Sequence, residues 1–249
     1  TIGFKKLVIK NKGLKKIINK NLKKKLSYHD IGFNIGPLIN SSGRIAKAND
    51  VVELFLSQND GKIDAIINKM NNHNKVRKKI EQENLKLINF KKYRNKNVVF
   101  VYNKEFHEGT IGIIAAKLSQ LFNKPSFVVT ESNGLLKCSA RSLNNIKINK
   151  TINKLMINNL IISGGGHEEA GGFTAMKEYL SNIEDFLEKE YENLNTTDYS
   201  CFDAYAIFPK KNSTIVNDLK SLEPFGKENP QPIFYFKDIK SIRSKIINK

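Results

Sequence analysis

Residues 97–130, NVVFVYNKEFHEGTIGIIAAKLSQLFNKPSFVVT, decide the fold class of this 249-residue chain. The β-branched and aromatic run at 97–102 is typical of a buried strand. The apolar stretch 109–122 predicts a helix, with Gly112 in its first turn. Residues 126–130 form a second strand-like run. Strand, helix and strand in this order predict an α/β domain.

The same kinds of pattern continue on both sides of this stretch. Downstream, we expect strands at 135–142 and 173–176 and helices at 148–158 and 180–194. Upstream, apolar residues recur at helical spacing without proline between 49 and 90, which predicts two helices, the second long. Short extended segments from about residue 199 predict a β-rich module.

The composition points towards nucleic acid. Lys and Arg total 42 against 24 Asp and Glu, a formal charge of +18, which favours a polyanionic partner. Lysine is frequent everywhere in the chain, so charge alone leaves the question open. An amphipathic helix predicted from Leu14 to Leu22 carries its lysines outward, either as a solvated face or as a stripe that follows DNA.

The cysteines and the hydropathy of the sequence indicate the cellular compartment that we expect for the protein. Cys138 and Cys201 are far apart and belong to no CxxC pair, so we expect neither a disulfide framework nor a zinc site, and a cytoplasmic protein. No run of about 18 apolar residues predicts a membrane span. The chain begins at Thr1 and ends after strand-like sequence, so we expect a piece of a longer protein.

Two segments rich in small residues are candidates for close approach to a ligand. Glycines and a proline in residues 28–37 indicate turns, and the NSSGR segment at 40–44 surrounds Arg44 with small neighbours. In residues 164–172, GGGHEEAGG, five glycines predict a loop whose free N–H groups form an anion cradle. His167 would lie inside it beside Gly165 and Gly166, to donate to a phosphate or act in acid–base chemistry. The alternative is a tight loop in which His167 caps backbone groups.

Three further residues suit phosphate binding. Ser139 and Arg141 are two apart on a predicted strand, so both side chains lie on one face, where a hydroxyl and a guanidinium together bind phosphate well. Such pairs are also common on surfaces. His107 joins a strand to a helix N-terminus, where it serves either as a phosphate ligand or as an N-terminal cap.

The order of these motifs is more specific than any one of them. NIGPLINSSGRI at 34–45, Asn74 and Arg77 on the long helix, FHEGTIGIIAAKL at 106–118, SARS at 139–142, GGGHEEAGGF at 164–173 and LEPFGKENPQPIF at 222–234 follow one another along almost the whole chain. In this order they resemble the RecJ branch of the DHH phosphoesterase family.

The resemblance implies an architecture. We expect a C-terminal remnant of a DHH catalytic domain at 1–50, connecting helices at 51–90, a DHHA1 domain at 91–195 and the start of an OB-fold at 199–249. The fold class is then α/β, with a DHHA1-type mixed sheet and flanking helices. OB-folds bind single strands with a basic groove and stacking aromatics. Phe225, Phe234, Tyr235 and Phe236 are candidates for stacking or for the core.

The resemblance also implies a function. It indicates the substrate-binding part of a metal-dependent 5′–3′ single-stranded DNA exonuclease that acts in DNA recombination and repair. Mn²⁺ or Mg²⁺ would be bound by a catalytic domain outside this chain, so the chain alone would be inactive. His29-Asp30 is not a DHH motif. The partners implied are single-stranded DNA and a single-strand-binding protein or helicase, with the enzyme a monomer and without a membrane.

Residue by residue, Arg44, Ser139, Arg141 and His167 match family positions that hold the DNA or its phosphate. Four positions depart from the family pattern. Leu38 stands in place of Arg, Phe106 in place of Trp, Cys138 in place of Gly and Glu228 in place of Gly.

Two other functions remain open at this point. The chain could be a non-catalytic module that binds single strands, or another DHHA1 protein such as an alanyl-tRNA editing protein or a small-nucleotide phosphodiesterase. The glycine-rich segment is shared with those relatives, whereas the NSSGR and LEPFGKENPQPIF segments favour the exonuclease.

Overall fold

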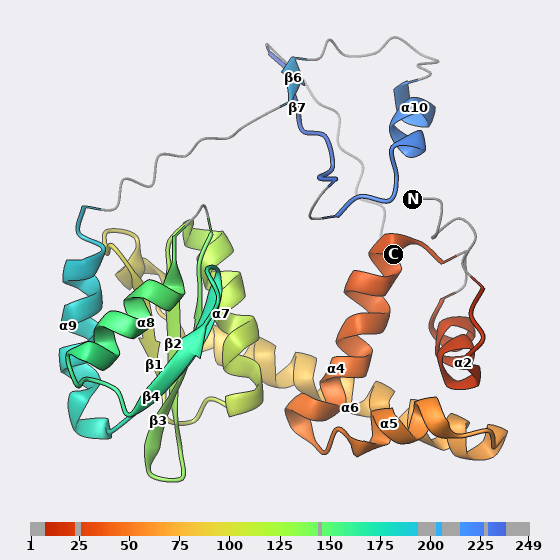
Figure 1. The fold of residues 1–249 in the computed structure, drawn as a ribbon, viewed down its shortest axis with the longest axis horizontal. Helices are drawn as coiled ribbons and strands as arrows, with labels where there is room; N and C mark the ends of the chain where they lie inside the picture. The colour runs from red at the N-terminus through yellow and green to blue at the C-terminus, as the bar shows by residue number, and fades with distance from the viewer. Residues whose placement is uncertain are drawn as a thin grey trace.

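The computed structural model of the chain describes residues 8–22, 26–143, 146–193, 203–205, 215–226 and 229–237. Figure 1 shows an α/β body and a helical body joined by one long helix, α6 (Asp60–Lys86). The predicted α/β class is confirmed.

A five-stranded mixed sheet forms the centre of the α/β body. Its strand order is β1-β2-β3-β5-β4, with β1 and β2 parallel and the other neighbours antiparallel. The strands are β1 (Val99–Tyr102), β2 (Ser126–Ser132), β3 (Leu135–Arg141), β4 (Ser163–Gly166) and β5 (Ala170–Ala175).

Helices cover both faces of this sheet, because successive side chains of a strand point to opposite faces. Phe127 and Val129 of β2 pack with α8 (Ile148–Ile157) and α9 (Leu180–Glu190) in one core. Val128, between them, packs with α7 (Glu108–Phe122) in another. Figure 1 shows α7 on one side and α8 and α9 on the other.

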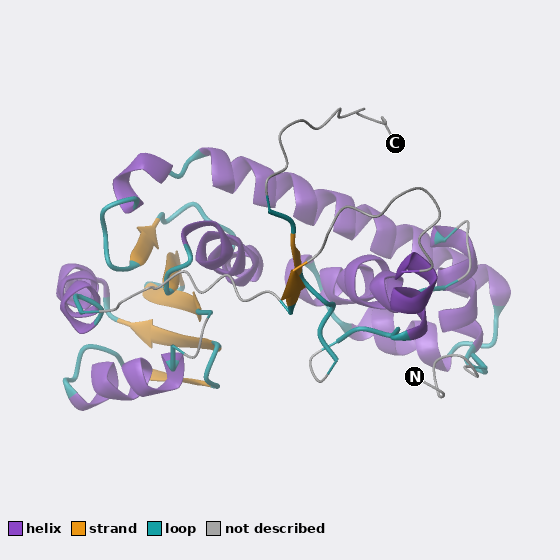
Figure 2. Cartoon of the chain, turned by 90° about the horizontal axis from the view of Figure 1, so that it is seen from above, coloured by secondary structure: helices purple, strands orange, loops and turns teal. Residues whose placement is uncertain are grey.

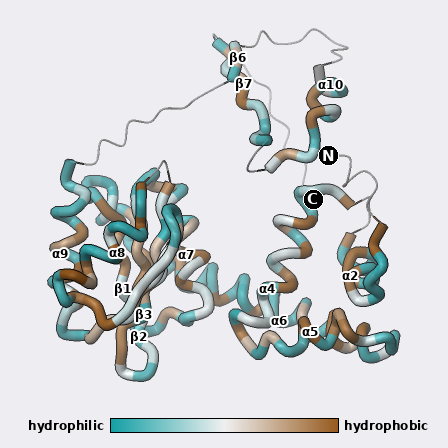
Figure 3. The backbone as a smooth tube through the Cα atoms, viewed as in Figure 1, coloured by the Kyte–Doolittle hydropathy of each residue, from teal (hydrophilic) through white to brown (hydrophobic). Residues whose placement is uncertain are grey.

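The helical body has its own core. In it α2 (Lys12–Asn21) and α5 (Asn49–Leu56) pack on the first half of α6 around Ile63, Ile67 and Met70. In Figure 3 hydrophobic and hydrophilic residues are interspersed along α5 and α6, as expected for helices that bury one face.

Helix α6 links the two bodies. Its 27 residues span about 40 Å at 1.5 Å per residue. Figure 2 shows it running along one side of the molecule. Near its end, Asn84 Nδ2 donates to Thr110 Oγ1 of α7 at 3.3 Å.

Residues 28–45 are helical, so the turns predicted there are wrong. The segment consists of α3 (Tyr28–Asp30), the π-helix η1 (Ile31–Ile35) and α4 (Gly36–Ile45). Ser27 and Asp30 form a capping box at its start. Gly36 and Pro37 lie in the first turn of α4, where proline is well tolerated.

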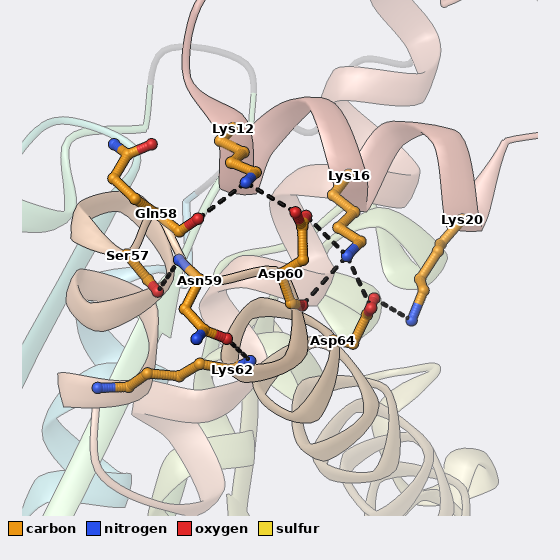
Figure 4. Close-up of polar contacts among 9 residues, drawn as sticks. All are labelled: Lys12, Lys16, Lys20, Ser57, Gln58, Asn59, Asp60, Lys62 and Asp64. Carbon is orange, nitrogen blue, oxygen red and sulfur yellow. Dashed lines mark hydrogen bonds and ion pairs between the residues drawn. The ribbon is translucent and has the colours of Figure 1, made fainter.

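The lysines of α2 are held by α6. Lys12, Lys16 and Lys20 alternate with Asp60 and Asp64 in a ladder of ion pairs between 2.6 and 3.0 Å (Figure 4). Hydrogen bonds from the lysines lower the pKa of both aspartates. These three lysines therefore connect two helices of the same chain, which argues against a stripe that follows DNA.

The remaining described elements are η2 (Phe90–Tyr93), η3 (Lys177–Tyr179), β6 (Ala204–Tyr205), α10 (Ile215–Ser221) and β7 (Phe234–Tyr235). Strands β6 and β7 are parallel. Phe234 and Tyr235 are exposed rather than in a core, while Phe225 packs edge-to-face on Tyr28.

Candidate functional site

A pocket of about 890 Å³ lies where the helical body meets the sheet. Arg44 reaches it from the last turn of α4, and His107 and Glu108 from the start of α7. Ser139 and Arg141 reach it from one face of β3, as their spacing predicts. Four of the seven predicted substrate-binding residues therefore line one pocket.

Two half-buried arginines dominate the pocket. Arg44 Nη1 donates to Gly109 O at 3.1 Å, and Arg141 Nη1 donates to Ala140 O at 2.7 Å and Ser139 Oγ at 3.2 Å. Burial lowers the pKa of Arg141, and the charge of Arg44 lowers it further. Both groups stay charged at neutral pH because a guanidinium keeps its proton in proteins.

No carboxylate in the described part of the chain forms an ion pair with either arginine. Glu108 also lines the pocket, but it is exposed. Glu81 attracts Arg44 electrostatically without forming an ion pair with it. Two like charges that are partly withdrawn from water repel each other. A bound anion relieves that repulsion, and a phosphate fits the paired guanidinium and hydroxyl donors.

Glycines allow the walls of the pocket to approach each other. A Cβ on Gly112 would lie 3.0 Å from Ser139 Oγ and 3.4 Å from Arg141 Nη2. A Cβ on Gly109 would lie 2.0 Å from Arg44 O. The first turn of α7 can therefore pack directly on both arginines, with its positive dipole end at the pocket.

His107 serves as the N-cap of α7. Its Nδ1 accepts a hydrogen bond from Gly109 N at 3.0 Å. The cap, one of the two predicted alternatives, is confirmed, and the side chain lines the pocket as well. Capping stabilises the start of α7, where Gly109 O accepts the hydrogen bond from Arg44.

The glycine-rich segment differs from its prediction. Gly165 and Gly166 belong to strand β4, which pairs with β5, so they form no loop. A Cβ on Gly166 would lie 2.3 Å from Ala170 O, so this glycine permits a tight hairpin. His167 is exposed at the turn, where its backbone N–H donates a hydrogen bond to Ala170 O. None of these three residues is among those that line the pocket.

Lys137 and Thr174 also line the pocket, and sequence reasoning missed both. Lys137 Nζ donates to Thr174 Oγ1 at 3.0 Å. Lys137 lies two residues before Ser139, so the alternation that paired Ser139 with Arg141 would have found it.

A buried ion pair of α6, between Arg77 and Glu81, acts electrostatically on Arg44. Arg77 donates to Glu81 Oε2 at 2.9 Å and to Asn74 Oδ1 at 3.1 and 3.2 Å. Burial lowers the pKa of Arg44, the charge of Arg77 lowers it further, and the charge of Glu81 opposes both effects. The NSSGR segment, through Arg44, and the Asn74–Arg77 pair of α6 therefore interact electrostatically.

Three of the four departures from the family pattern can be placed. Leu38 and Phe106 are buried. Cys138 is buried beneath the pocket, and its burial raises the pKa of the thiol well above the ordinary value. Glu228 lies outside the described residues.

Within the described ranges, no group of three or more His, Cys, Asp or Glu side chains is placed to hold a metal ion. Asp30 illustrates this: it is buried and accepts hydrogen bonds from Ser27 and Asn34, as part of a helix cap. None of the described helices is long and apolar enough to cross a membrane.

Comparison with known proteins finds similar domains and similar proteins. The model of the DHHA1 domain matches residues 95–195, and that of the RecJ OB domain matches residues 202–249. The single-stranded-DNA-specific exonuclease RecJ of Haemophilus influenzae is 25% identical over 89% of the chain, and that of Escherichia coli is 29% identical over 66%. The chain spans only 41% and 30% of these relatives' lengths.

The solved structures agree on the fold. The crystal structure of RecJ in complex with Mn²⁺ from Thermus thermophilus matches 90% of this chain, with a TM-score of 0.78 and 22% identity, and the match spans 34% of that protein.

Proposed function

The chain is RecJ-like, and we propose that it forms the substrate-binding part of a metal-dependent 5′–3′ single-stranded DNA exonuclease that acts in DNA recombination and repair. One observation carries the proposal: Arg44 and Arg141 lie half-buried in one pocket, and neither forms an ion pair with a carboxylate among the described residues. The relatives supply the substrate class, because the curated matches are single-stranded-DNA-specific exonucleases.

In this proposal the pocket holds a phosphate of the strand. Arg141 and Ser139 donate from β3, and Arg44 donates from α4 while its own backbone is held against α7. These groups position the phosphodiester and stabilise the negative charge that develops during hydrolysis. His167, Gly165 and Gly166 remain proposed DNA contacts only for a strand long enough to extend past the pocket.

The metal ion is proposed to bind outside this chain. The described residues offer no metal-binding cluster, so no catalytic step through a metal is derived for this chain. We propose that Mn²⁺ or Mg²⁺ is held by a part of the enzyme outside these 249 residues and that it activates the attacking water there. We further propose a cytoplasmic, monomeric enzyme that cooperates with a single-strand-binding protein or a helicase.

Two variants of equal charge test the phosphate site. Arg141→Met removes one guanidinium from the pocket, and Arg94→Met removes one from an exposed position. We expect Arg141→Met to weaken binding of a 5′-phosphorylated single strand by about 10- to 150-fold, which corresponds to 1.5–3 kcal/mol for a charged hydrogen bond. Arg94→Met should have little effect. Fluorescence anisotropy measures both, and equal losses would mean that only net charge matters.

The match to the RecJ OB domain argues against an alanyl-tRNA editing protein. A non-catalytic single-strand-binding module remains the behaviour that we expect of the isolated chain.

A further inference from the structure

The pocket of Arg44 and Arg141, which we call the phosphate pocket, shares one wall residue with a second hollow. Arg44 lines both the pocket and a hollow of about 700 Å³ between α4 and α6. A third hollow of about 540 Å³ shares Asn21, Asn71, Asn74 and Lys78 with the second. We call the second and third hollows, with these shared residues, the polar trough. Arg44 is the residue that the trough shares with the phosphate pocket.

The trough suits a polyanion with bases. Its walls carry mostly amide and ammonium groups. The carboxylate of Glu81, which also lines it, is paired with Arg77 and Lys117. Lys78 forms no ion pair among the described residues. Amides can hydrogen-bond the edges of bases, and ammonium groups attract phosphates.

One aromatic side chain at the wall of the trough is exposed. Phe33 is 69% exposed and lines the second hollow. Its ring stacks on that of His29, with centroids 4.4 Å apart and 23° between the planes. His29 thus supports the ring from one side. Phe33 also lies in the π-helix η1, a rare form that often occurs at functional sites.

Single exposed apolar residues are common and by themselves indicate nothing. Leu56 is 75% exposed and Ile157 is 79% exposed on other helices. Phe33 differs from both because it is aromatic, is supported by a stacked ring and lines a hollow that shares Arg44 with the phosphate pocket. These three features together match the way proteins bind single strands.

The spacing also fits a strand. Phe33 and Arg44 are eleven residues apart on one continuous helical segment, which places them about three turns and about 16 Å apart on nearly the same side. A few nucleotides span that distance. A strand whose phosphate is at Arg44 therefore reaches Phe33 along the trough.

We propose that Phe33, supported by His29, is a stacking platform for a nucleobase of the single strand, and that the strand runs along the polar trough. This inference rests on the proposed function, because it places the phosphate of the same strand between Arg44 and Arg141. It adds a base contact that is tolerant of sequence, since every base has a flat face.

The chain contains no tryptophan, so Phe33→Trp introduces a single fluorescent reporter at the platform. The matched control is Leu56→Trp, which places an equally exposed reporter away from the trough. We expect a single-stranded oligonucleotide to quench Phe33→Trp but not Leu56→Trp. An abasic oligonucleotide of the same length should quench neither. Fluorescence of Phe33→Trp that does not respond to the oligonucleotide overturns the proposal.

Phe33→Ala provides an independent measurement. We expect it to weaken binding of the oligonucleotide by about 5- to 150-fold and to leave binding of the abasic strand unchanged. Unchanged affinity for the oligonucleotide would also overturn the platform. The effect of Arg141→Met, measured in parallel, reports on the phosphate site separately. A strand whose binding depends on Arg141 but not on Phe33 refutes only the platform.

Discussion

Adding one methyl group at Gly112, in the variant Gly112→Ala, should weaken binding of single-stranded DNA without lowering the stability of the fold. Gly112 lies in α7, where Ala is preferred over Gly by about 1 kcal/mol. Against this gain, the new Cβ would lie 3.0 Å from Ser139 Oγ and 3.4 Å from Arg141 Nη2, so the hydroxyl must move by a few tenths of an ångström. We therefore expect the free energy of unfolding of Gly112→Ala to stay within about 1 kcal/mol of the parent.

Binding should fall although stability does not. Moving Ser139 Oγ disturbs its 3.2 Å hydrogen bond from Arg141, and the methyl group occupies the floor of the pocket. If one charged hydrogen bond to phosphate is lost, affinity for a 5′-phosphorylated single strand falls by about 10- to 150-fold.

The assay combines urea unfolding with fluorescence anisotropy. Gly61→Ala is the matched control, because its Cβ would meet only Asn59 Oδ1, at 3.4 Å, in α6. It should bind like the parent. If Gly112→Ala folds normally and binds as tightly as the parent, the phosphate does not lie beside Ser139 and Arg141, and the reasoning is refuted.

Three further predictions concern the rest of the chain. Replacing both Asp60 and Asp64 by Asn should lower the melting temperature at neutral pH. The folded-state pKa values of the two aspartates lie below the unfolded value of about 3.9, so the difference in melting temperature should vanish as the pH falls through the folded values. A difference that persists in acid would contradict the ladder. Glu81→Gln leaves the buried Arg77 without its carboxylate and should lower the free energy of unfolding, measured with urea, by about 3–5 kcal/mol. Glu83→Gln, at an exposed position, should change it very little. Equal losses in the two variants would argue against the buried ion pair. The 249-residue chain should bind single-stranded DNA with an affinity that falls steeply as the salt concentration rises. It should show no nuclease activity with Mn²⁺. Mn²⁺-dependent cleavage would show that catalysis needs no further part of the enzyme.

The α/β body could be predicted because its signals are local. The β-branched runs of β1 and β2, and the apolar spacing of α7, depend on residues close together in sequence. The sheet order β1-β2-β3-β5-β4 depends on contacts between distant strands, and no local pattern contains it.

Residues 28–45 show the limit of local reasoning. Gly36 and Pro37 are typical of turns, yet the first turn of a helix also accepts both. The capping box of Ser27 and Asp30 was the available signal for a helix start. The π-helix that carries Phe33 has no sequence pattern by which to predict it.

The candidate site was predicted in part for a similar reason. Ser139 and Arg141 follow from strand alternation alone. Arg44 joins them only because α4 and β3, 97 residues apart at these arginines, meet across the start of α7. The glycines of β4 were predicted to lie in a loop, but they lie in a strand, where their small size allows hairpin pairing with β5.

The most direct test of the phosphate site is a crystal structure of the chain bound to a 5′-phosphorylated single-stranded oligonucleotide. We predict a phosphate between Arg44 and Arg141, with guanidinium nitrogens about 2.7–2.9 Å from its oxygens. A phosphate bound at the turn of His167, with no nucleotide contacting either arginine, would contradict the account.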